Sequence, residues 1–264
     1  GILVFDDFWL NSHPNLPDDV FAFNRNAVEK IKRLRNHPSI AVWCGDNEGV
    51  PLAPLNEWLR EDVKAFDGGD RWYQPISREY GFSGSGPWVN AHPIWYFTAH
   101  PLGYGEHKLD GWGFRTEIGS AVFTNYESYK KFMPEPERWP ASPGMLDKHF
   151  FGNSAGNARP TRYFAAVEYN YGKAVGAEDF CRKAQLLNIE VNKAMYEGWQ
   201  HHLWNDASGI LTWMSQSAYP SFVWQTYDYY YDLNGAYWGV RKACEPLHIQ
   251  WSYADNTVKV VNAS

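Results

Sequence analysis

The stretch 35–48 reads RNHPSIAVWCGDNE and contains, in order, the end of a helix, a strand and a polar segment. His37-Pro38 ends the helix, because the ring of a proline disfavours helical geometry in the residue before it. Residues 39–43 form a short apolar run, which is typical of a strand buried on both faces of a parallel sheet. We therefore expect a strand whose carboxyl end carries the polar residues 46–48.

The segments on either side of this stretch repeat the same order of elements. Gly1 to Phe8, GILVFDDF, is another apolar run, and it closes on the carboxylates Asp6 and Asp7. A helical stripe of apolar residues follows Asp18 and Asp19 as far as Asn36, and residues 55–66 predict a second helix. Strands that alternate with helices are typical of parallel α/β units, so we expect an α/β fold.

The rest of the chain predicts more of these elements and then a change of pattern. Strands are expected at 73–77, 113–117 and 209–214, and helices at 178–202 and 235–244. Residues 81–112 are rich in Gly, Pro, His and aromatic residues without a clean period, which predicts one long functional loop or several short ones. Two alternating segments, 247–253 and 257–261, predict a β-hairpin that starts a separate β domain.

Composition limits the classes of function. The formal net charge is only -6, so no basic field attracts nucleic acid, and we expect no nucleic-acid partner. No apolar run approaches the roughly 20 residues of a membrane helix, and we expect no membrane partner. The three cysteines form no CxxC pair, and we expect neither a metal site nor a cofactor.

Aromatic residues make up 17% of the 264-residue chain, with 14 Trp and 17 Tyr, which weakly favours a sugar-stacking cleft. The compartment is not predicted.

Acidic side chains follow several of the expected strands. In a parallel barrel, the carboxyl ends of the strands face the active site. Here such ends carry Asp6-Asp7, Asn47-Glu48 and Glu117, and a fourth carries Trp213. Cleavage of a glycoside needs one protonated carboxyl group, which donates to the leaving oxygen, and one ionised carboxylate. For a single Glu, a structural salt bridge or a helix cap is the alternative.

Two motifs resemble a known family. The run 35–48 resembles the acid/base signature of glycoside hydrolase family 2, in which an Asn-Glu pair ends the fourth strand. Residues 113–120, GFRTEIGS, resemble the nucleophile segment of that family, at the end of the seventh strand. The interval between Glu48 and Glu117 (117 − 48 = 69 residues) is similar to the interval in such enzymes.

The resemblance extends along nearly the whole chain. Residues 1–9 resemble the third barrel strand, residues 211–230 the eighth strand with its aromatic continuation, and residues 243–250 the junction with a following sandwich domain. The resemblance therefore implies a partial (β/α)8 barrel of about strands 3 to 8 at 1–246 and the start of a β-sandwich at 247–264. The first two strands and the preceding domains would then be an N-terminal part of the same enzyme that this chain lacks, so we expect the chain alone to be inactive.

The motifs also imply roles for single residues. Glu48 would be the general acid/base, and Asn47 would hydrogen-bond the sugar 2-hydroxyl; a turn residue is the alternative for Asn47. Asp46 stands where the family often has Gly or Asn, and two roles are open for this third carboxylate: it raises the pKa of Glu48, or it contacts a polar or cationic substituent of the substrate.

Glu117 would be the nucleophile, about 5–5.5 Å from the acid/base carboxyl as in retaining enzymes. Arg115 is expected to keep Glu117 charged and to contribute to the substrate site, with a strand-end salt bridge as the alternative. The family's tyrosine beside the nucleophile has two candidates, Tyr96 and Tyr104.

Aromatic and acidic residues complete the expected substrate site. Trp213 is expected as a platform under the sugar, with core packing as its alternative, and Trp224 lies in the aromatic segment that follows. Asp7 is expected to bind sugar hydroxyls, as is Asp6, and a structural role is as good an interpretation for either one.

The resemblance implies a retaining glycosidase that acts on β-mannosidic linkages of oligosaccharides or glycans through an ester on Glu117. An exo-β-D-glucosaminidase ranks second, because such enzymes tend to have Ser-Asp where this chain has Asn47-Glu48. A third hypothesis, of another class, is an inactive or sugar-binding barrel, whose expected mark is the loss of one carboxylate.

Overall fold

The computed structural model describes residues 1–12, 14–88, 90–98, 112–140, 142, 146, 148–150 and 160–263. Its chain divides into two compact units. Unit 1 covers residues 1–85, and unit 2 covers the described residues from 86 onward. Each unit is described by itself below. Within the described residues, no helix is both long enough and apolar enough to span a bilayer.

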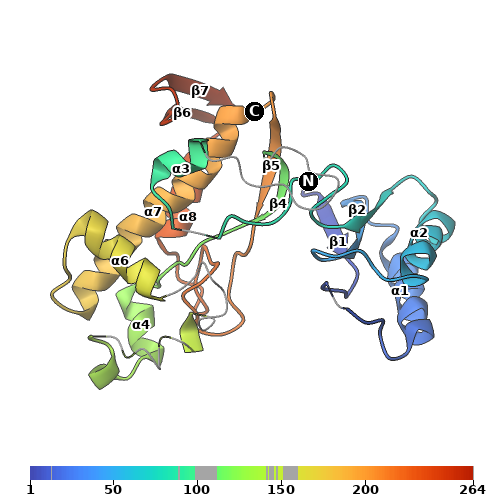
Figure 1. Cartoon of the computed structure of the whole chain (residues 1–264), viewed down its shortest axis with the longest axis horizontal. Helices are drawn as coiled ribbons and strands as arrows, with labels where there is room; N and C mark the ends of the chain where they lie inside the picture. The colour runs from blue at the N-terminus through green and yellow to red at the C-terminus, as the bar shows by residue number, and fades with distance from the viewer. Residues whose placement is uncertain are drawn as a thin grey trace. The chain divides into compact units, whose positions relative to one another are not determined.

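Unit 1 is a parallel α/β unit, as the sequence predicts. Its elements are β1 (Val4–Asp7), α1 (Val20–Leu34), β2 (Ile40–Asp46), α2 (Leu55–Phe66) and β3 (Trp72–Ile76). The strand order is β1-β2-β3, and both pairings are parallel. Figure 1 shows α1 and α2 side by side along this sheet. The carboxyl ends of the three strands therefore meet at one edge, where the polar residues after each strand gather.

Local signals explain where the helices of unit 1 begin and what they bury. Asp19 is the N-cap of α1, and its side chain accepts a hydrogen bond of 2.8 Å from the backbone N–H of Ala22. Ile31 of α1 and Leu59 of α2 are fully buried against Trp43 of β2. The apolar stripes predicted from the sequence are thus the faces that cover the sheet.

Unit 2 contains a second parallel strand pair among several helices. Its first elements are α3 (Pro93–Thr98), β4 (Gly113–Ile118), α4 (Tyr126–Phe132), the 3₁₀ turn η1 (Glu135–Glu137) and α6 (Pro160–Tyr171). Its later elements are α7 (Ala177–His202), β5 (Ala207–Thr212), α8 (Gly235–Ala243), β6 (Leu247–Trp251) and β7 (Val258–Asn262). Strands β4 and β5 pair in parallel, from Gly113 beside Ala207 to Ile118 beside Thr212.

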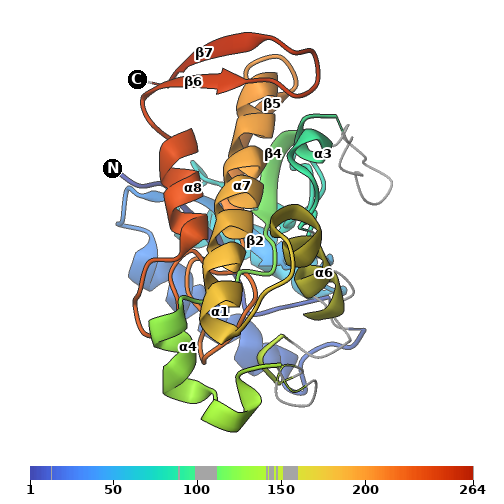
Figure 2. The same ribbon diagram turned by 90° about the vertical axis from the view of Figure 1, so that its left-hand side faces the viewer.

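Helix α7 is the central element of unit 2, and α8 packs along it (Figure 2). Two glycines of α8 permit this close approach. A Cβ on Gly235 would lie 2.3 Å from the carbonyl oxygen of Gln185, and one on Gly239 would lie 2.4 Å from that of Ile189. Any larger residue at either position would force the two helices apart.

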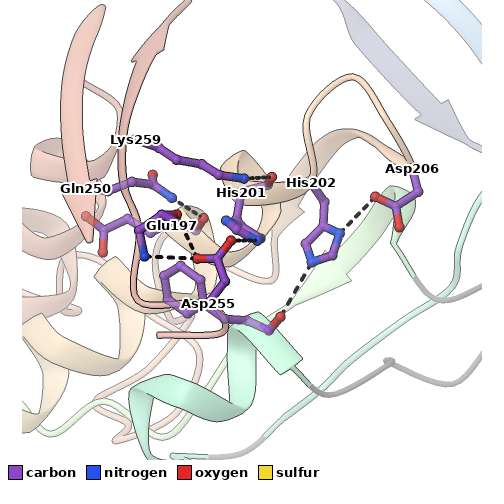
Figure 3. Close-up of polar contacts among 9 residues, drawn as sticks. Glu197, His201, His202, Asp206, Gln250, Asp255 and Lys259 are labelled. Atoms are coloured by element: carbon purple, nitrogen blue, oxygen red, sulfur yellow. Dashed lines mark hydrogen bonds and ion pairs between the residues drawn. The ribbon is translucent and has the colours of Figure 1, made fainter. Parts of the chain in front are cut away.

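The hairpin β6–β7 is antiparallel and packs its polar face on the C-terminal part of α7. Figure 3 shows Glu197 of α7 beside Gln250 and Lys259 of the hairpin. The buried Glu197 carboxylate accepts from Lys193 (2.6 Å) and contacts His248 Nε2 (2.7 Å). Gln250 donates to the Glu197 backbone carbonyl over 2.9 Å. The hairpin therefore belongs to the same compact unit as α7.

The opposite face of this hairpin is apolar and exposed. The side chains that point outward are Leu247, Ile249, Trp251, Val258 and Val260, each at least 49% exposed. Exposed apolar residues on one face of a two-stranded sheet are typical of a surface that another element covers.

We expect His248→Ala to lower the free energy of unfolding by about 1–3 kcal/mol, because it removes a buried hydrogen-bond partner of the Glu197 carboxylate. Ile249→Ala is the matched control on the exposed face of the same strand, and its expected effect is within about 0.5 kcal/mol. Urea unfolding followed by tryptophan fluorescence measures both. Equal losses in the two variants would show that the polar contacts do not anchor the hairpin.

Candidate active site

Asp46 is the last residue of β2, and it is buried, with only 3% of its surface exposed. Its Oδ1 accepts a hydrogen bond of 2.9 Å from the backbone N–H of Ser12. Asp46 thus holds the segment that follows β1 against the end of β2. This burial favours a structural role for Asp46 over the substrate contact expected from the sequence.

Asn47 links the segments that follow all three strands of unit 1. Its backbone N–H donates to the Leu10 carbonyl (3.1 Å), and its Nδ2 donates to Asn11 Oδ1 (3.2 Å). Its Oδ1 accepts from Ser77 Oγ over 3.1 Å. The side-chain amide is therefore fixed in orientation before any ligand binds.

Glu48 is held in an unusual backbone conformation. Its φ is +57°, in the left-handed region, which costs a bulky residue of order 1–3 kcal/mol and persists where the surroundings fix it. Its backbone N–H donates to Ser77 Oγ over 2.9 Å. The Ser85 hydroxyl donates to its Oε1, and Arg78 Nη1 lies 3.9 Å from its Oε2. The carboxyl group is thus oriented by a hydroxyl and a guanidinium, and 32% of the side chain stays exposed.

Ser77, Arg78 and Ser85 are the residues that the sequence reasoning missed. Ser77 and Arg78 directly follow β3, at the same sheet edge as Glu48. The signal was present in part, because polar residues directly after a strand that pairs with the Glu48 strand belong to this edge. Ser85 had no such signal, because it lies 37 residues from Glu48 in the sequence and follows no predicted strand.

Asp6 and Asp7 at the end of β1 have different environments. Asp6 forms an ion pair with Lys30 of α1 at 2.7 Å, which supports the structural interpretation of this residue. Asp7 keeps contact with solvent on one side. The surrounding protein atoms desolvate its carboxyl group, and this raises the pKa of Asp7. A hydrogen bond with Cys44 and the charge of Lys30 lower the pKa, but by less than desolvation raises it. Burial and the nearby Asp7 raise the pKa of the Cys44 thiol, which keeps it protonated.

Glu117 lies in unit 2, one residue before the end of β4, and is half-buried. Arg115, two residues earlier on the same face of the strand, is fully buried, with its guanidinium carbon 5.5 Å from the centre of the Trp199 ring. A cation at 0% exposure is not available to a sugar, so the geometry does not support the substrate contact expected of Arg115. Its place beside Glu117 suits its other expected role, a positive charge that favours the ionised carboxylate.

Trp213 and Trp224 both form backbone hydrogen bonds with the segment that follows Glu117. The Trp213 N–H donates to the Ile118 carbonyl (2.8 Å), and the Trp224 N–H donates to that of Ser120 (2.8 Å). A Cβ on Gly119 would lie 2.1 Å from the Trp213 carbonyl oxygen, so only glycine permits this approach. Trp213 is 41% exposed, as a sugar platform requires. Trp224 is half-buried, 5.4 Å between ring centres from Trp88.

Of the two tyrosine candidates, Tyr96 lies on α3 and is buried. Its hydroxyl oxygen accepts from the Ala91 N–H over 3.2 Å, and burial raises the pKa of the phenol. Tyr104 lies outside the described residues. Across the part of the chain that the structure describes, no three His, Cys, Asp or Glu side chains are grouped as a metal site requires.

Comparison with known proteins gives a consistent set of relatives, although no protein-family model matches the chain. A mannosylglycoprotein endo-β-mannosidase from Lilium longiflorum is 28% identical over all of this chain and 32% of its own length. An exo-β-D-glucosaminidase from Streptomyces avermitilis is 30% identical over 87% of this chain and 26% of its own length. The chain thus spans between a quarter and a third of the length of these relatives.

A solved structure agrees with the sequence relatives. The exo-chitosanase CsxA from Amycolatopsis orientalis superposes with a TM-score of 0.78 at 26% identity, over 90% of this chain and 29% of its own. The family resemblance inferred from the two motifs is therefore confirmed. The comparisons do not test the role of any single residue.

Proposed function

From its homology to the β-mannosidase and exo-β-D-glucosaminidase branch of glycoside hydrolase family 2, we propose that this chain is part of the catalytic region of a retaining β-glycoside hydrolase. The observation that carries the proposal is the fixed carboxyl of Glu48 at a strand end, with backbone and side chain both held by hydrogen bonds. Glu117, near the end of β4, whose last residue Ile118 accepts a hydrogen bond from the backbone N–H of the exposed Trp213, is the second carboxylate.

The proposed reaction is a double displacement. In the first step the Glu117 carboxylate attacks the anomeric carbon, the bond to the leaving oxygen breaks, and Glu48 gives that oxygen its proton. In the second step Glu48, now ionised, takes a proton from water, and the oxygen of that water displaces Glu117 from the glycosyl ester. Asn47 holds the sugar 2-hydroxyl, and Trp213 supports the face of the ring.

The proposed substrates are β-mannosidic linkages in oligosaccharides or glycans. The Asn47-Glu48 pair supports this choice over an exo-β-D-glucosaminidase, the second candidate. An amine-bearing sugar needs a carboxylate partner, and the burial of Asp46 removes one of the two candidates for that role. Asp7, which keeps contact with solvent, is the carboxylate on which the glucosaminidase alternative depends.

We further propose that the two parallel sheets belong to one (β/α)8 barrel at residues 1–246, whose preceding part is contributed by another segment of the same enzyme. Exposed apolar residues before β1, Ile2 and Leu3, support this view, because they would be covered by a neighbouring strand. The outward apolar face of β6–β7 supports assignment of residues 247–264 to the start of a β-sandwich.

A screen with nitrophenyl β-mannoside, β-glucosaminide, β-galactoside and β-glucuronide tests the proposal. We expect the longer enzyme to hydrolyse the β-mannoside at least about tenfold faster, by kcat/KM, than the other three, and residues 1–264 alone to be inactive, because a barrel site is built from the ends of many strands. Activity of residues 1–264 alone would refute the division of the site. A preference for the β-glucosaminide would select the second candidate, and no hydrolysis of any of the four would favour a sugar-binding barrel.

A further inference from the structure

The loop between β5 and α8 contains a turn that is closed by one buried carboxylate. Asp228 is 2% exposed, and its Oδ1 accepts from the backbone N–H groups of Tyr230 (2.8 Å) and Asp232 (3.1 Å). Its Oδ2 accepts from the Thr124 hydroxyl, and its backbone N–H donates to the Asp232 carbonyl over 2.9 Å. The turn 228–232 is therefore fixed by the protein itself.

This fixed turn presents tyrosine rings to solvent. Tyr231 is 77% exposed and Tyr229 is 42% exposed, and Tyr231 has a φ of +64°. Tyr230 between them packs near Phe132, with ring centres 6.3 Å apart, and lies under the ammonium group of Lys131 at 4.6 Å. Large exposed rings held in a left-handed, pinned turn do not contribute to a core, and a fixed exposed aromatic surface is typical of a binding site.

The rings border a cleft of about 550 Å³ in unit 2, which we call the tyrosine cleft. It is lined by Lys131, Gln216, Ser217, Ala218 and the three tyrosines 229–231. Its described lining thus combines aromatic faces, hydroxyl and amide groups and one ammonium group, with no carboxylate. Among the described residues, no carboxylate oxygen lies within salt-bridge distance of Lys131.

We propose that the tyrosine cleft binds an uncharged β-linked glycan chain, as a saccharide contact additional to Trp213. Tyrosine faces stack on the apolar faces of pyranose rings, and the tyrosine hydroxyls and the Gln216 amide are groups that hydrogen-bond sugar hydroxyls. The Lys131 ammonium repels an amine-bearing chain, so the cleft selects a neutral mannan-type glycan over chitosan. The class of ligand in this inference rests on the proposed function. The loop that carries the cleft begins at Trp213, which is the proposed platform for the sugar ring.

Titration of residues 1–264 with β-1,4-mannotetraose and with the tetramer of glucosamine, followed by heteronuclear NMR, tests the cleft directly. We expect binding of mannotetraose with shifts in the 216–218 and 229–231 amides, and a loss of affinity of about tenfold in the double variant Tyr229→Ala/Tyr231→Ala. Tyr169→Ala, which removes an 88% exposed tyrosine of α6 outside the cleft, is the matched control and should bind as the parent does.

Lys131→Glu keeps the rings and reverses the charge, so it should bind the glucosamine tetramer more tightly than the parent chain does. Any of three results would refute glycan binding at the tyrosine cleft. Mannotetraose does not bind, Tyr169→Ala loses as much affinity as the double variant, or Trp213→Ala alone removes all binding. The titration measures binding and needs no turnover. Failure of hydrolysis in the screen above would therefore contradict the proposed reaction but not glycan binding at the tyrosine cleft. Normal hydrolysis together with unchanged mannotetraose binding in the double variant would contradict glycan binding at the tyrosine cleft alone.

Discussion

Glu117→Ala in the longer enzyme should reduce turnover of every β-glycoside by roughly 10⁴-fold or more, whatever the leaving group. Without the carboxylate no glycosyl ester forms, so protonation of the leaving group cannot compensate. The loss should therefore be the same for a dinitrophenyl glycoside and for a natural disaccharide. Initial rates on both substrates measure it. Glu127→Ala, which removes an exposed glutamate that pairs with Lys130 on α4, is the matched control and should keep full activity.

Small anions provide the sharper test of the same variant. Azide or formate fits the space that the Glu117 side chain leaves, and it attacks the anomeric carbon from the same face. We expect partial recovery of activity and an α-glycosyl azide product, identified by NMR. Recovery with a β-glycosyl azide would mean that Glu117 is not the nucleophile.

Glu48→Ala should separate substrates by their leaving groups. A dinitrophenolate departs without a proton, so formation of the glycosyl ester is spared, whereas an alkoxide leaving group loses general acid catalysis of about 10²–10⁴-fold. Burst kinetics on the dinitrophenyl glycoside and steady-state rates on a disaccharide measure the two effects. Glu57→Ala, on the exposed face of α2, is the control and should change neither rate.

Azide also tests the second step in the Glu48 variant. It needs no general base, so it should react with the glycosyl ester on Glu117 and give the β-glycosyl azide. The opposite anomers in the two variants would show that the two roles are exchanged. An equal loss on activated and unactivated substrates in Glu48→Ala would remove Glu48 as the acid.

The sequence predicted the elements whose pattern is local. Helix α2 occupies the predicted residues 55–66, and α1 begins directly after Asp18 and Asp19, as predicted, and ends at Leu34, two residues before the predicted end at Asn36. Helices α3, α4 and α6 were not predicted. Helix α3, PIWYFT, has six residues and no polar face, and α4 has seven residues, which is too short for a 3.6-residue period to show. Helix α6 mixes aromatic and polar residues around its circumference.

For the candidate site, the sequence by itself predicted the two carboxylates, their order and their place at or near the ends of parallel strands, because each motif is a short run of neighbouring residues. The tertiary structure alone decided which partners surround them. Ser77 and Ser85 reach Glu48 across 29 and 37 residues of chain. The burial of Asp46 and Arg115, which argues against a sugar contact for either, depends on packing by elements distant in sequence. Hydrogen bonding and desolvation act through space, so no local pattern of residues encodes them.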